Sequence, residues 1–306
     1  MTMMLFPMPG NERMTNAIAE RVGCSVGKLA LRRFPDGESY IRLHSAVAGC
    51  DAAVVCTLAR PDDQFLQLLF AARLLRESGA RSVQLVAPYL AYMRQDRRFH
   101  DGEALTSRQF AQLLSAEFDG LVTVDPHLHR YGNLQEIYSI ETEALAASPL
   151  LAEWIRDHVE APLIIGPDSE SEQWAGAIAG HIGAPHVVFT KTRRGDRDVI
   201  IAAANLSAWK GRAPVLVDDV ISSGHTLANA AREIREQGFP APICLAVHGL
   251  FASDAEAMLR DLGCRLVTTD SIPHSSNAIA LAAILGNALA GQVATIDAKR
   301  LRNTPK

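Results

Sequence analysis

The chain has 306 residues, of which 48% are hydrophobic and 21% are charged, an ordinary balance for a globular protein of two domains or one large one. Its net charge of -4 gives no global basic field for nucleic acid, and no apolar run approaches the roughly 18 residues of a membrane span. The 5 cysteines are scattered without a Cys-x-x-Cys spacing, which is typical of a reducing compartment, so we expect a cytoplasmic protein without nucleic-acid or membrane partners.

Strand-like and helix-like runs alternate along the chain. The apolar start, MTMMLFPMPGN, lacks the basic region and long apolar core of a signal peptide and is predicted to be the first strand. The next predicted strands are AAVVCTL, SVQLVAPYL, GLVTVDPH, PLIIGPD and PHVVFTKTRR. The predicted helices between them are QFLQLLFAARLLRESG, SRQFAQLLSAEF, SPLLAEWIRDHV and SEQWAGAIAGHIG. This alternation predicts an α/β fold with mostly parallel strands flanked by helices.

An internal echo indicates two related halves. AARLLRESG at 71–79 resembles AAREIREQG at 230–238, and each follows a predicted strand and ends in glycine before another. Convergent composition of amphipathic helices is the alternative explanation. We expect two domains, 1–148 and 149–306, with the boundary in the alanine-rich stretch next to Pro149.

The first half carries two polar segments with candidate ligand-binding residues. RRFPDGESYIRL places Asp36, Gly37 and Glu38 at a turn between strand-like runs, and Pro-Asp-Gly is also ordinary turn chemistry. YLAYMRQDRRFHDGEAL places Arg94 and Gln95 after an apolar strand. Arginine and glutamine have several hydrogen-bonding atoms in fixed geometry, which suits phosphates and nucleobase edges, although a solvated charged loop has the same composition.

Two further strands end in polar clusters. VTVDPHLHR ends in His127 and His129, and LIIGPDSESE ends in Asp168. Because ligands bind at the carboxyl ends of parallel strands, these clusters predict one functional edge, although each side chain alone is also compatible with a simple turn. Histidine and aspartate there are candidates for holding a metal ion.

A basic stretch, VVFTKTRRGDRDV, places Lys191 and Arg193 before Gly195. A basic segment containing glycine can move and close over a phosphate-bearing substrate. A solvated basic hairpin is the alternative.

The most informative stretch is VLVDDVISSGHTLANAAREI at 215–234. An apolar strand ends in Asp218 and Asp219, a short polar loop follows, and apolar residues then recur at helical spacing. The loop and the start of the helix contain Ser222, Ser223, Gly224, His225 and Thr226. Hydroxyls and a helix N-terminus suit phosphate, whereas the acids suit sugar hydroxyls or a hydrated divalent metal. A strand, an acidic turn and a helix cap are the alternative.

Together these motifs resemble the ribose-phosphate pyrophosphokinases, also called phosphoribosyl diphosphate synthetases. The acidic strand and Ser/Thr-rich loop look like the phosphoribosyl-diphosphate motif of type I phosphoribosyltransferase folds. FPDGE, RQDRRF, VDPH, GPD, KTR and SIPHS occur in the order typical of the family, from about residue 5 to residue 290. The resemblance implies two phosphoribosyltransferase-like domains. It also implies transfer of the diphosphoryl group of ATP to the 1-hydroxyl of ribose 5-phosphate, with Mg²⁺.

The resemblance assigns a role to each motif. For ATP it implies Phe34, Asp36, Gly37, Glu38, Arg94 and Gln95, with the adenine contacts made from a neighbouring subunit. For Mg²⁺ or its waters it implies His127 and Asp168. For ribose 5-phosphate it implies Asp218 and Asp219 on the hydroxyls and residues 222–226 around the phosphate. Lys191 and Arg193 would stabilise the charge that develops during transfer, and Arg193 would also contact ribose 5-phosphate.

Two departures from the family pattern leave alternatives open. His225 stands where a small residue is usual, and Glu170 and Glu172 lie in a segment that is usually rich in glycine or alanine. A weakly active, regulatory relative is one alternative, and a phosphoribosyltransferase, which would share the 215–227 motif, is another. An adenine site borrowed across subunits implies a homodimer or a hexamer built from dimers.

Overall fold

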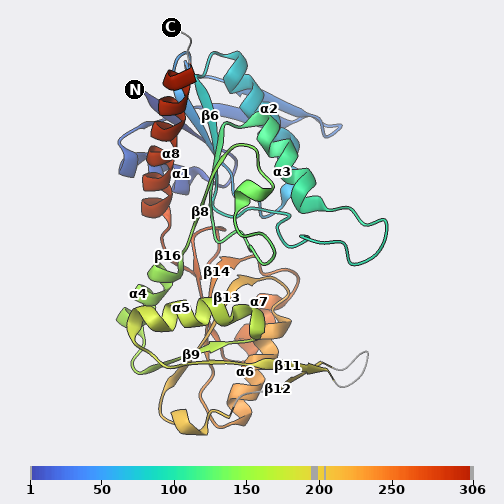
Figure 1. The fold of residues 1–306 in the computed structure, drawn as a ribbon, viewed down its shortest axis with the longest axis vertical. Helices are drawn as coiled ribbons and strands as arrows, with labels where there is room; N and C mark the ends of the chain where they lie inside the picture. Colours follow the sequence, from blue (N-terminus) through green and yellow to red (C-terminus); the bar gives the residue numbers. More distant parts are fainter. Residues whose placement is uncertain (1, 194–198, 203–204, 304–306) are drawn as a thin grey trace. The chain divides into compact units, whose positions relative to one another are not determined.

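The computed structural model describes residues 2–193, 199–202 and 205–303 (Figure 1). The chain forms two compact units. Unit 1 comprises Met1–Leu145 together with Leu281–Lys306, and unit 2 comprises Ala146–Ala280. In the described part of the chain, each unit is built on a six-stranded sheet in which all neighbouring strands are parallel.

The sheet of unit 1 has the strand order β2-β1-β5-β6-β7-β8. Its strands are β1 (Met3–Pro7), β2 (Ser25–Val26), β5 (Asp51–Val55), β6 (Ser82–Ala87), β7 (Gly120–Val124) and β8 (Glu141–Leu145). The helices are α1 (Glu12–Val22), α2 (Pro61–Glu77), α3 (Thr106–Glu117) and α8 (Ala282–Asn303), with the short η1 (Leu134–Glu136). Helices α1 and α8 lie together on one face, and α2 and α3 lie side by side on the other (Figure 1).

The sheet of unit 2 has the strand order β10-β9-β13-β14-β15-β16. Its strands are β9 (Pro162–Gly166), β10 (His186–Val188), β13 (Ala213–Ile221), β14 (Ile243–Gly249), β15 (Arg265–Thr269) and β16 (Asn277–Ile279). The helices are α4 (Ser148–His158), α5 (Glu172–Ile182), α6 (His225–Glu236) and α7 (Ala255–Asp261), with the short η2 (Ser169–Ser171) and η3 (Ser207–Trp209). Helices α4 and α5 pack together, as do α6 and α7.

The central strands form from short runs that are mostly apolar. Every residue of β5, β6 and β7 is buried, as expected for strands covered by helices on both faces. The predicted α/β fold with mostly parallel strands is therefore confirmed. Burial also raises the pKa of the Cys56 thiol, which follows β5, to about 12, so that sulfur is a packing group rather than a nucleophile.

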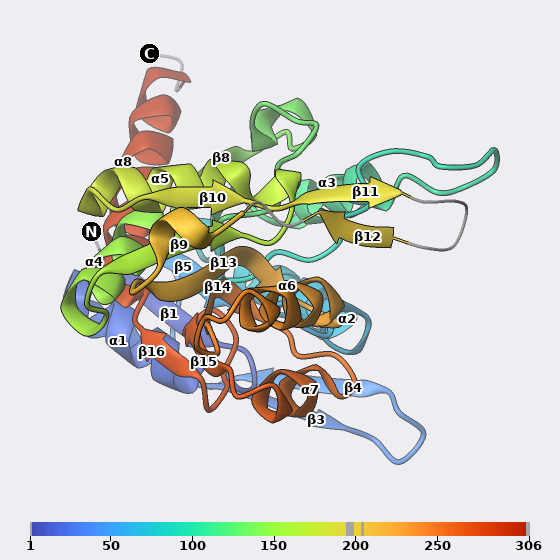
Figure 2. The same ribbon diagram turned by 90° about the horizontal axis from the view of Figure 1, so that it is seen from below.

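The two units share one topology. The strand orders correspond position by position. Along the chain, each unit also carries an antiparallel hairpin between the second and third strands of its six-stranded sheet. These hairpins are β3 (Leu29–Arg33) with β4 (Ser39–Leu43), and β11 (Thr190–Arg193) with β12 (Val199–Ala202) (Figure 2). The echoed segments 71–79 and 230–238 lie at the ends of α2 and α6, which occupy equivalent places. This equivalence supports duplication rather than convergent composition.

The last helix departs from the expected 149–306 domain, because residues from 281 onwards pack with unit 1. Helix α8 lies against α1, β7 and β8. The buried Gln292 side chain donates from Nε2 to the carbonyl oxygens of Leu121 and Glu141, both at 3.1 Å. Lys299 pairs with the Glu141 carboxylate. A helix pattern in the sequence shows that one face is apolar but does not show which sheet that face covers.

Among the described residues, no helix combines the length and the apolar character needed to cross a membrane.

We expect Leu289→Ala to lower the free energy of unfolding of unit 1 by about 2–5 kcal/mol, because it leaves a cavity under α8, where Leu289 is fully buried. Denaturant unfolding followed by circular dichroism measures this loss. Asn287→Ala, at an exposed position of the same helix, is the matched control and should change stability by less than about 0.5 kcal/mol. Equal effects of the two substitutions would contradict the docking of α8.

Candidate functional site

The acidic pair of unit 2 lies within a strand rather than after it. The sequence pattern predicts a strand that stops at the acids, but β13 continues to Ile221, with Asp218 opposite Ala246 and Val220 opposite His248 of β14. The strand is longer because the sequence after the acids returns to apolar residues, which are buried. The sheet backbone therefore fixes the positions of both carboxylates.

Asp168, Asp218 and Asp219 come together near the carboxyl ends of β9 and β13. Asp219 is buried and Asp218 is half-buried, and the backbone N–H of Asp219 donates to Asp218 Oδ1 at 3.0 Å. Desolvation raises the pKa of Asp218 well above its ordinary value, and the nearby charges of Asp219 and Asp168 raise it further. Such a cluster is suited to hydrogen-bond donors such as sugar hydroxyls, or to a cation.

The Asp168 carboxylate is held by its own loop. Its Oδ1 accepts hydrogen bonds from the backbone N–H groups of Glu170 at 3.1 Å and Ser171 at 3.3 Å, which caps η2. Ser171 Oγ donates to the Asp168 carbonyl oxygen at 2.6 Å. Asp168 is therefore oriented before any ligand binds. Glu170 and Glu172 are exposed to solvent, so their charges are screened by water.

Two physical requirements favour glycine at position 224, directly before α6. Its φ is 74°, a left-handed conformation that glycine adopts without strain. A Cβ at this position would lie 3.1 Å from Ala255 Cβ and 3.3 Å from Met258 Cε, so the backbone also passes close to α7. From the sequence, glycine at this position was expected to let a ligand approach the backbone. The structure adds a second reason for glycine, which is the close packing of this backbone against α7.

The loop before α6 offers polar groups next to a helix N-terminus. Ser223 and His225 are exposed, and Ser222 and Thr226 are half-buried. Among the described residues, no side chain caps the start of α6, so its first N–H groups remain donors for an anion. His225 occupies the first position of the helix, where its larger side chain extends into solvent.

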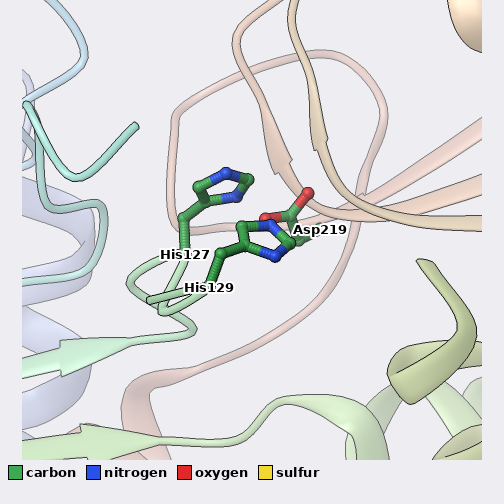
Figure 3. Close-up of side chains that lie close together, drawn as sticks. All are labelled: His127, His129 and Asp219. Atoms are coloured by element: carbon green, nitrogen blue, oxygen red, sulfur yellow. The ribbon is translucent and has the colours of Figure 1, made fainter. Parts of the chain in front are cut away.

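In unit 1, the loop after β7 holds two histidines in a strained backbone. Asp125 has φ 35° and His127 has φ 53°, which are unusual values for residues other than glycine. The rings of His127 and His129 meet edge to face with centroids 4.1 Å apart (Figure 3). Strain of this kind often accompanies functional sites. The sequence pattern places both His127 and His129 after the strand, whereas the resemblance implies a metal role for His127 alone.

The Arg94–Gln95 segment follows β6 and leads to α3. The Gln95 side chain accepts from Thr106 Oγ1 at 2.9 Å, so it is held against the start of α3, whereas Arg94 is exposed. Asp96 pairs with Arg130 at 3.0 Å. One ATP-binding candidate is thus fixed within unit 1 and the other extends into solvent.

The turn of the β3–β4 hairpin presents an aromatic ring. Phe34 N–H donates to the Glu38 carbonyl oxygen at 2.7 Å, and Glu38 N–H donates to Asp36 Oδ1 at 3.1 Å. Gly37 has φ 93°, a value that glycine accommodates. The Arg32 guanidinium lies 4.5 Å from the Phe34 ring centroid, and Phe34 itself is exposed. These contacts order the turn and leave it accessible.

Lys191 and Arg193 have backbone positions in β11, opposite Ile201 and Val199 of β12. Their side chains lie outside the part of the chain that the structure describes. Their hairpin occupies the place in unit 2 that β3–β4 occupies in unit 1.

Comparison with known proteins gives the family. Residues 3–117 match the N-terminal domain of ribose phosphate pyrophosphokinase, and residues 133–274 match the phosphoribosyl transferase domain. The chain is 31% identical over 274 residues to a ribose-phosphate pyrophosphokinase of Methanopyrus kandleri, which covers 88% of this chain and 92% of that protein. The chain belongs to the ribose-phosphate pyrophosphokinase family.

Other family members agree with this assignment. The ribose-phosphate pyrophosphokinase of Saccharolobus solfataricus is 35% identical over 251 residues, which are 80% of this chain and 84% of that protein. The crystal structure of phosphoribosylpyrophosphate synthetase from Mycobacterium smegmatis matches with a TM-score of 0.85 and 25% identity, covering 96% of this chain and 100% of that chain. The family resemblance inferred from the motifs is confirmed.

We expect Gly224→Ala to destabilise the protein more than Gly211→Ala. Both glycines have positive φ, which costs alanine about 1–2 kcal/mol, but only Gly224 has α7 atoms within 4 Å of an added Cβ. Denaturant unfolding of the two variants separates backbone strain from crowding. Equal losses of unfolding free energy in the two variants would show that α7 moves to accommodate the added Cβ without measurable cost.

We expect Asp218→Asn to stabilise the ligand-free protein at pH values above the ordinary pKa range of aspartate. The raised pKa means that the folded state binds the proton more tightly, so ionisation costs free energy of folding as the pH rises through the folded-state pKa. Asparagine cannot ionise and removes this cost. Thermal unfolding in EDTA should show a higher Tm than the native chain at pH 8 and a vanishing difference at low pH. Asp261→Asn at the exposed end of α7 is the control. A lower Tm at pH 8 would contradict the electrostatic account.

Proposed function

We propose that this chain transfers the diphosphoryl group of ATP to the 1-hydroxyl of ribose 5-phosphate, giving phosphoribosyl diphosphate and AMP. The family match, which extends over 92% of the length of the Methanopyrus kandleri relative, carries this proposal. The carboxylate cluster of unit 2, next to the N-terminus of α6, supports it because the two features suit a sugar and its phosphate respectively.

For ribose 5-phosphate, we assign the hydroxyls to Asp218 and Asp219. We assign the phosphate to the loop at 222–226. Its hydrogen-bond donors are the hydroxyls of Ser222, Ser223 and Thr226 and the first backbone N–H groups of α6. Because Asp218 is held in a strand and Gly224 is fixed against α7, both halves of this subsite are ordered before the substrate binds.

For Mg²⁺, we assign His127 and Asp168 as the residues that hold the ion or its waters. The donor chemistry fits, because a carboxylate oxygen is a preferred Mg²⁺ ligand and an imidazole can accept a hydrogen bond from a metal-bound water. Burial raises the pKa of Asp218, and the negative charges of Asp219 and Asp168 raise it further; a cation bound nearby would offset these charges. When bound, Mg²⁺ neutralises the transferring phosphates.

For ATP, we assign Arg94 and Gln95 to the nucleotide and the exposed Phe34–Glu38 turn to adenine. The turn is ordered and accessible, which suits a contact made in a neighbouring subunit. This assignment requires a homodimer or a hexamer built from dimers.

The described helices and the scattered cysteines are compatible with a cytoplasmic enzyme.

For the transfer step, we assign Lys191 and Arg193 to the charge that develops on the phosphoryl oxygens, with Arg193 also contacting ribose 5-phosphate. Phosphoryl transfer depends on positioning and electrostatic stabilisation, so fixed cations are the chemistry it needs. A phosphoribosyltransferase is less well supported, because it does not account for the match of residues 3–117 to the N-terminal pyrophosphokinase domain.

We expect the purified protein to form AMP from Mg²⁺-ATP only when ribose 5-phosphate is present.

We expect Lys191→Ala to lower kcat by about 10²–10³-fold with a smaller change in KM, because the lysine would act on the charge that develops during transfer. Chromatographic detection of AMP and phosphoribosyl diphosphate measures both. Lys210→Ala, at an exposed position of unit 2, is the control.

Each other outcome has a definite meaning. Formation of ADP instead of AMP would rule out diphosphoryl transfer. Absence of any sugar-dependent product would leave the regulatory alternative. A near-normal kcat for Lys191→Ala would remove that residue from the transfer step while leaving the reaction intact.

A further inference from the structure

The SIPHS segment at 271–275 is a motif of the sequence to which no role has yet been given. It lies between β15 and β16, at the carboxyl end of β15. Its turn is held by Asn277, whose Oδ1 accepts from the backbone N–H of His274 at 2.8 Å. The Nδ2 of the same side chain donates to the Thr269 carbonyl oxygen at 2.6 Å. The backbone of His274 is therefore fixed on the end of the sheet.

The hydrogen bonds of the His274 ring define its tautomer. The backbone N–H of Ser276 donates to Nδ1 at 3.2 Å, so this nitrogen is an acceptor and the neutral ring carries its proton on Nε2. Nε2 lies 3.1 Å from Glu256 Oε2 on α7 and donates to it. The neutral imidazole thus binds α7 directly, without needing a second proton.

The face of the same ring packs on Phe251, in the loop at 250–254 after β14. The two ring centroids are 4.2 Å apart, and the ring planes are inclined by 28°. Phe251 has φ 44° and Ser253 has φ 57°, left-handed values that residues other than glycine keep only where the surrounding structure holds them. The Phe251 ring also covers Gly249, since a Cβ added there would lie 2.6 Å from Phe251 Cε2. His274 is part of the packing that holds this strained loop.

The loop after β14 is hydrogen-bonded to the start of the loop before α6. The backbone N–H groups of Leu250 and Phe251 both donate to the Ile221 carbonyl oxygen at 3.0 Å. The N–H of Ala252 donates to the Ser222 carbonyl oxygen at 3.0 Å. These bonds fix the backbone at the point where β13 ends and the polar loop begins.

Helix α7 supports the other end of the loop before α6. The two helices α6 and α7 lie next to each other in unit 2 (Figure 2). Ala255 of α7 packs on Gly224, with 3.1 Å between its Cβ and a Cβ added at Gly224. Ala255 is followed directly by Glu256, the partner of His274. His274 therefore contacts both supports of the loop, one through Phe251 and the other through Glu256.

We propose that His274 is a positioning residue for the loop that we assign to the phosphate of ribose 5-phosphate. The inference rests on the proposed function and gives the SIPHS segment a role in it. His274 acts through Phe251 on the loop after β14 and through Glu256 on α7. A loop that binds a phosphate through aligned N–H and hydroxyl groups loses affinity when its backbone shifts. The effect is therefore on the affinity for the sugar phosphate rather than for ATP.

Steady-state kinetics with each substrate varied in turn tests this role. We expect His274→Ala and Glu256→Ala to raise the KM for ribose 5-phosphate about tenfold, and to change kcat and the KM for ATP less than about twofold. Glu256→Gln keeps an oxygen that accepts from His274 Nε2, so it should retain a near-native KM. The matched control is His158→Ala, which removes another stacked histidine of unit 2, 4.6 Å from the Trp154 ring, and should leave both KM values unchanged.

Hydrogen exchange followed by mass spectrometry tests the positioning without catalysis. In His274→Ala, we expect the amides of Leu250, Phe251 and Ala252 to exchange about tenfold faster or more, while the amides of α4 keep their native rates. His158→Ala should leave the three amides as protected as in the native chain. If His274→Ala does not fold, Glu256→Ala, a change at a partly exposed carboxylate, carries the kinetic test, and Phe251→Leu, which removes the ring stacking but keeps an apolar side chain, carries the exchange test.

The other outcomes separate this role from simpler explanations. An unchanged KM for ribose 5-phosphate with unchanged exchange in His274→Ala would overturn the positioning role. Equal increases in both KM values, with faster exchange throughout unit 2, would reduce His274 to a residue of general stability and would overturn it as well. Failure of the native protein to bind ribose 5-phosphate in a calorimetric titration would overturn the proposed function itself. A native chain that is active, with variants that behave like it, would overturn the positioning role alone.

Discussion

Crowding of negative charge at the carboxyl ends of β9 and β13 is the constraint on which the candidate site depends. Asp218 and Asp219 are adjacent in a strand, so they cannot separate, and their fields reach the fixed Asp168. A protein under no functional demand would replace one of these acids, because burying like charges costs stability. Three features of the surrounding structure hold the cluster in place. They are the hydrogen bonding of β13 to its neighbouring strands, the cap that Asp168 makes on η2, and the packing of Gly224 on α7.

The duplicated topology explains how one fold supplies different chemistry twice. Both units place a hairpin between corresponding strands, but the first carries an aromatic and acidic turn and the second carries the basic Lys191–Arg193 strand. Only β13 extends far enough to include an acidic pair, whereas β5 ends at Val55. The two units therefore differ at strand ends and hairpins, while the middles of their sheets are buried in both.

The sequence predicted the features that depend on local pattern. Apolar runs located the central strands, and helical spacing located α2 to α6, because burial and periodicity act within a few residues. The return of α8 to unit 1 was not predicted, since Gln292 finds its carbonyl partners more than 150 residues away. Nor was the continuation of β13 through two acids, which depends on the matching length of β14. At Gly224, the sequence identified the residue but only the structure revealed its contact with α7.

The path of α8 has a consequence for the order of folding during synthesis. All the strands of unit 1 leave the ribosome before unit 2, yet the helix that covers α1, β7 and β8 is made after unit 2. Unit 2, which is continuous from Ala146 to Ala280, can complete its core first. Until α8 arrives, the face of the first sheet that it covers stays open to water. The half of the protein that is translated first is thus the half that is finished last, and it is the half in which a nascent chain would need protection.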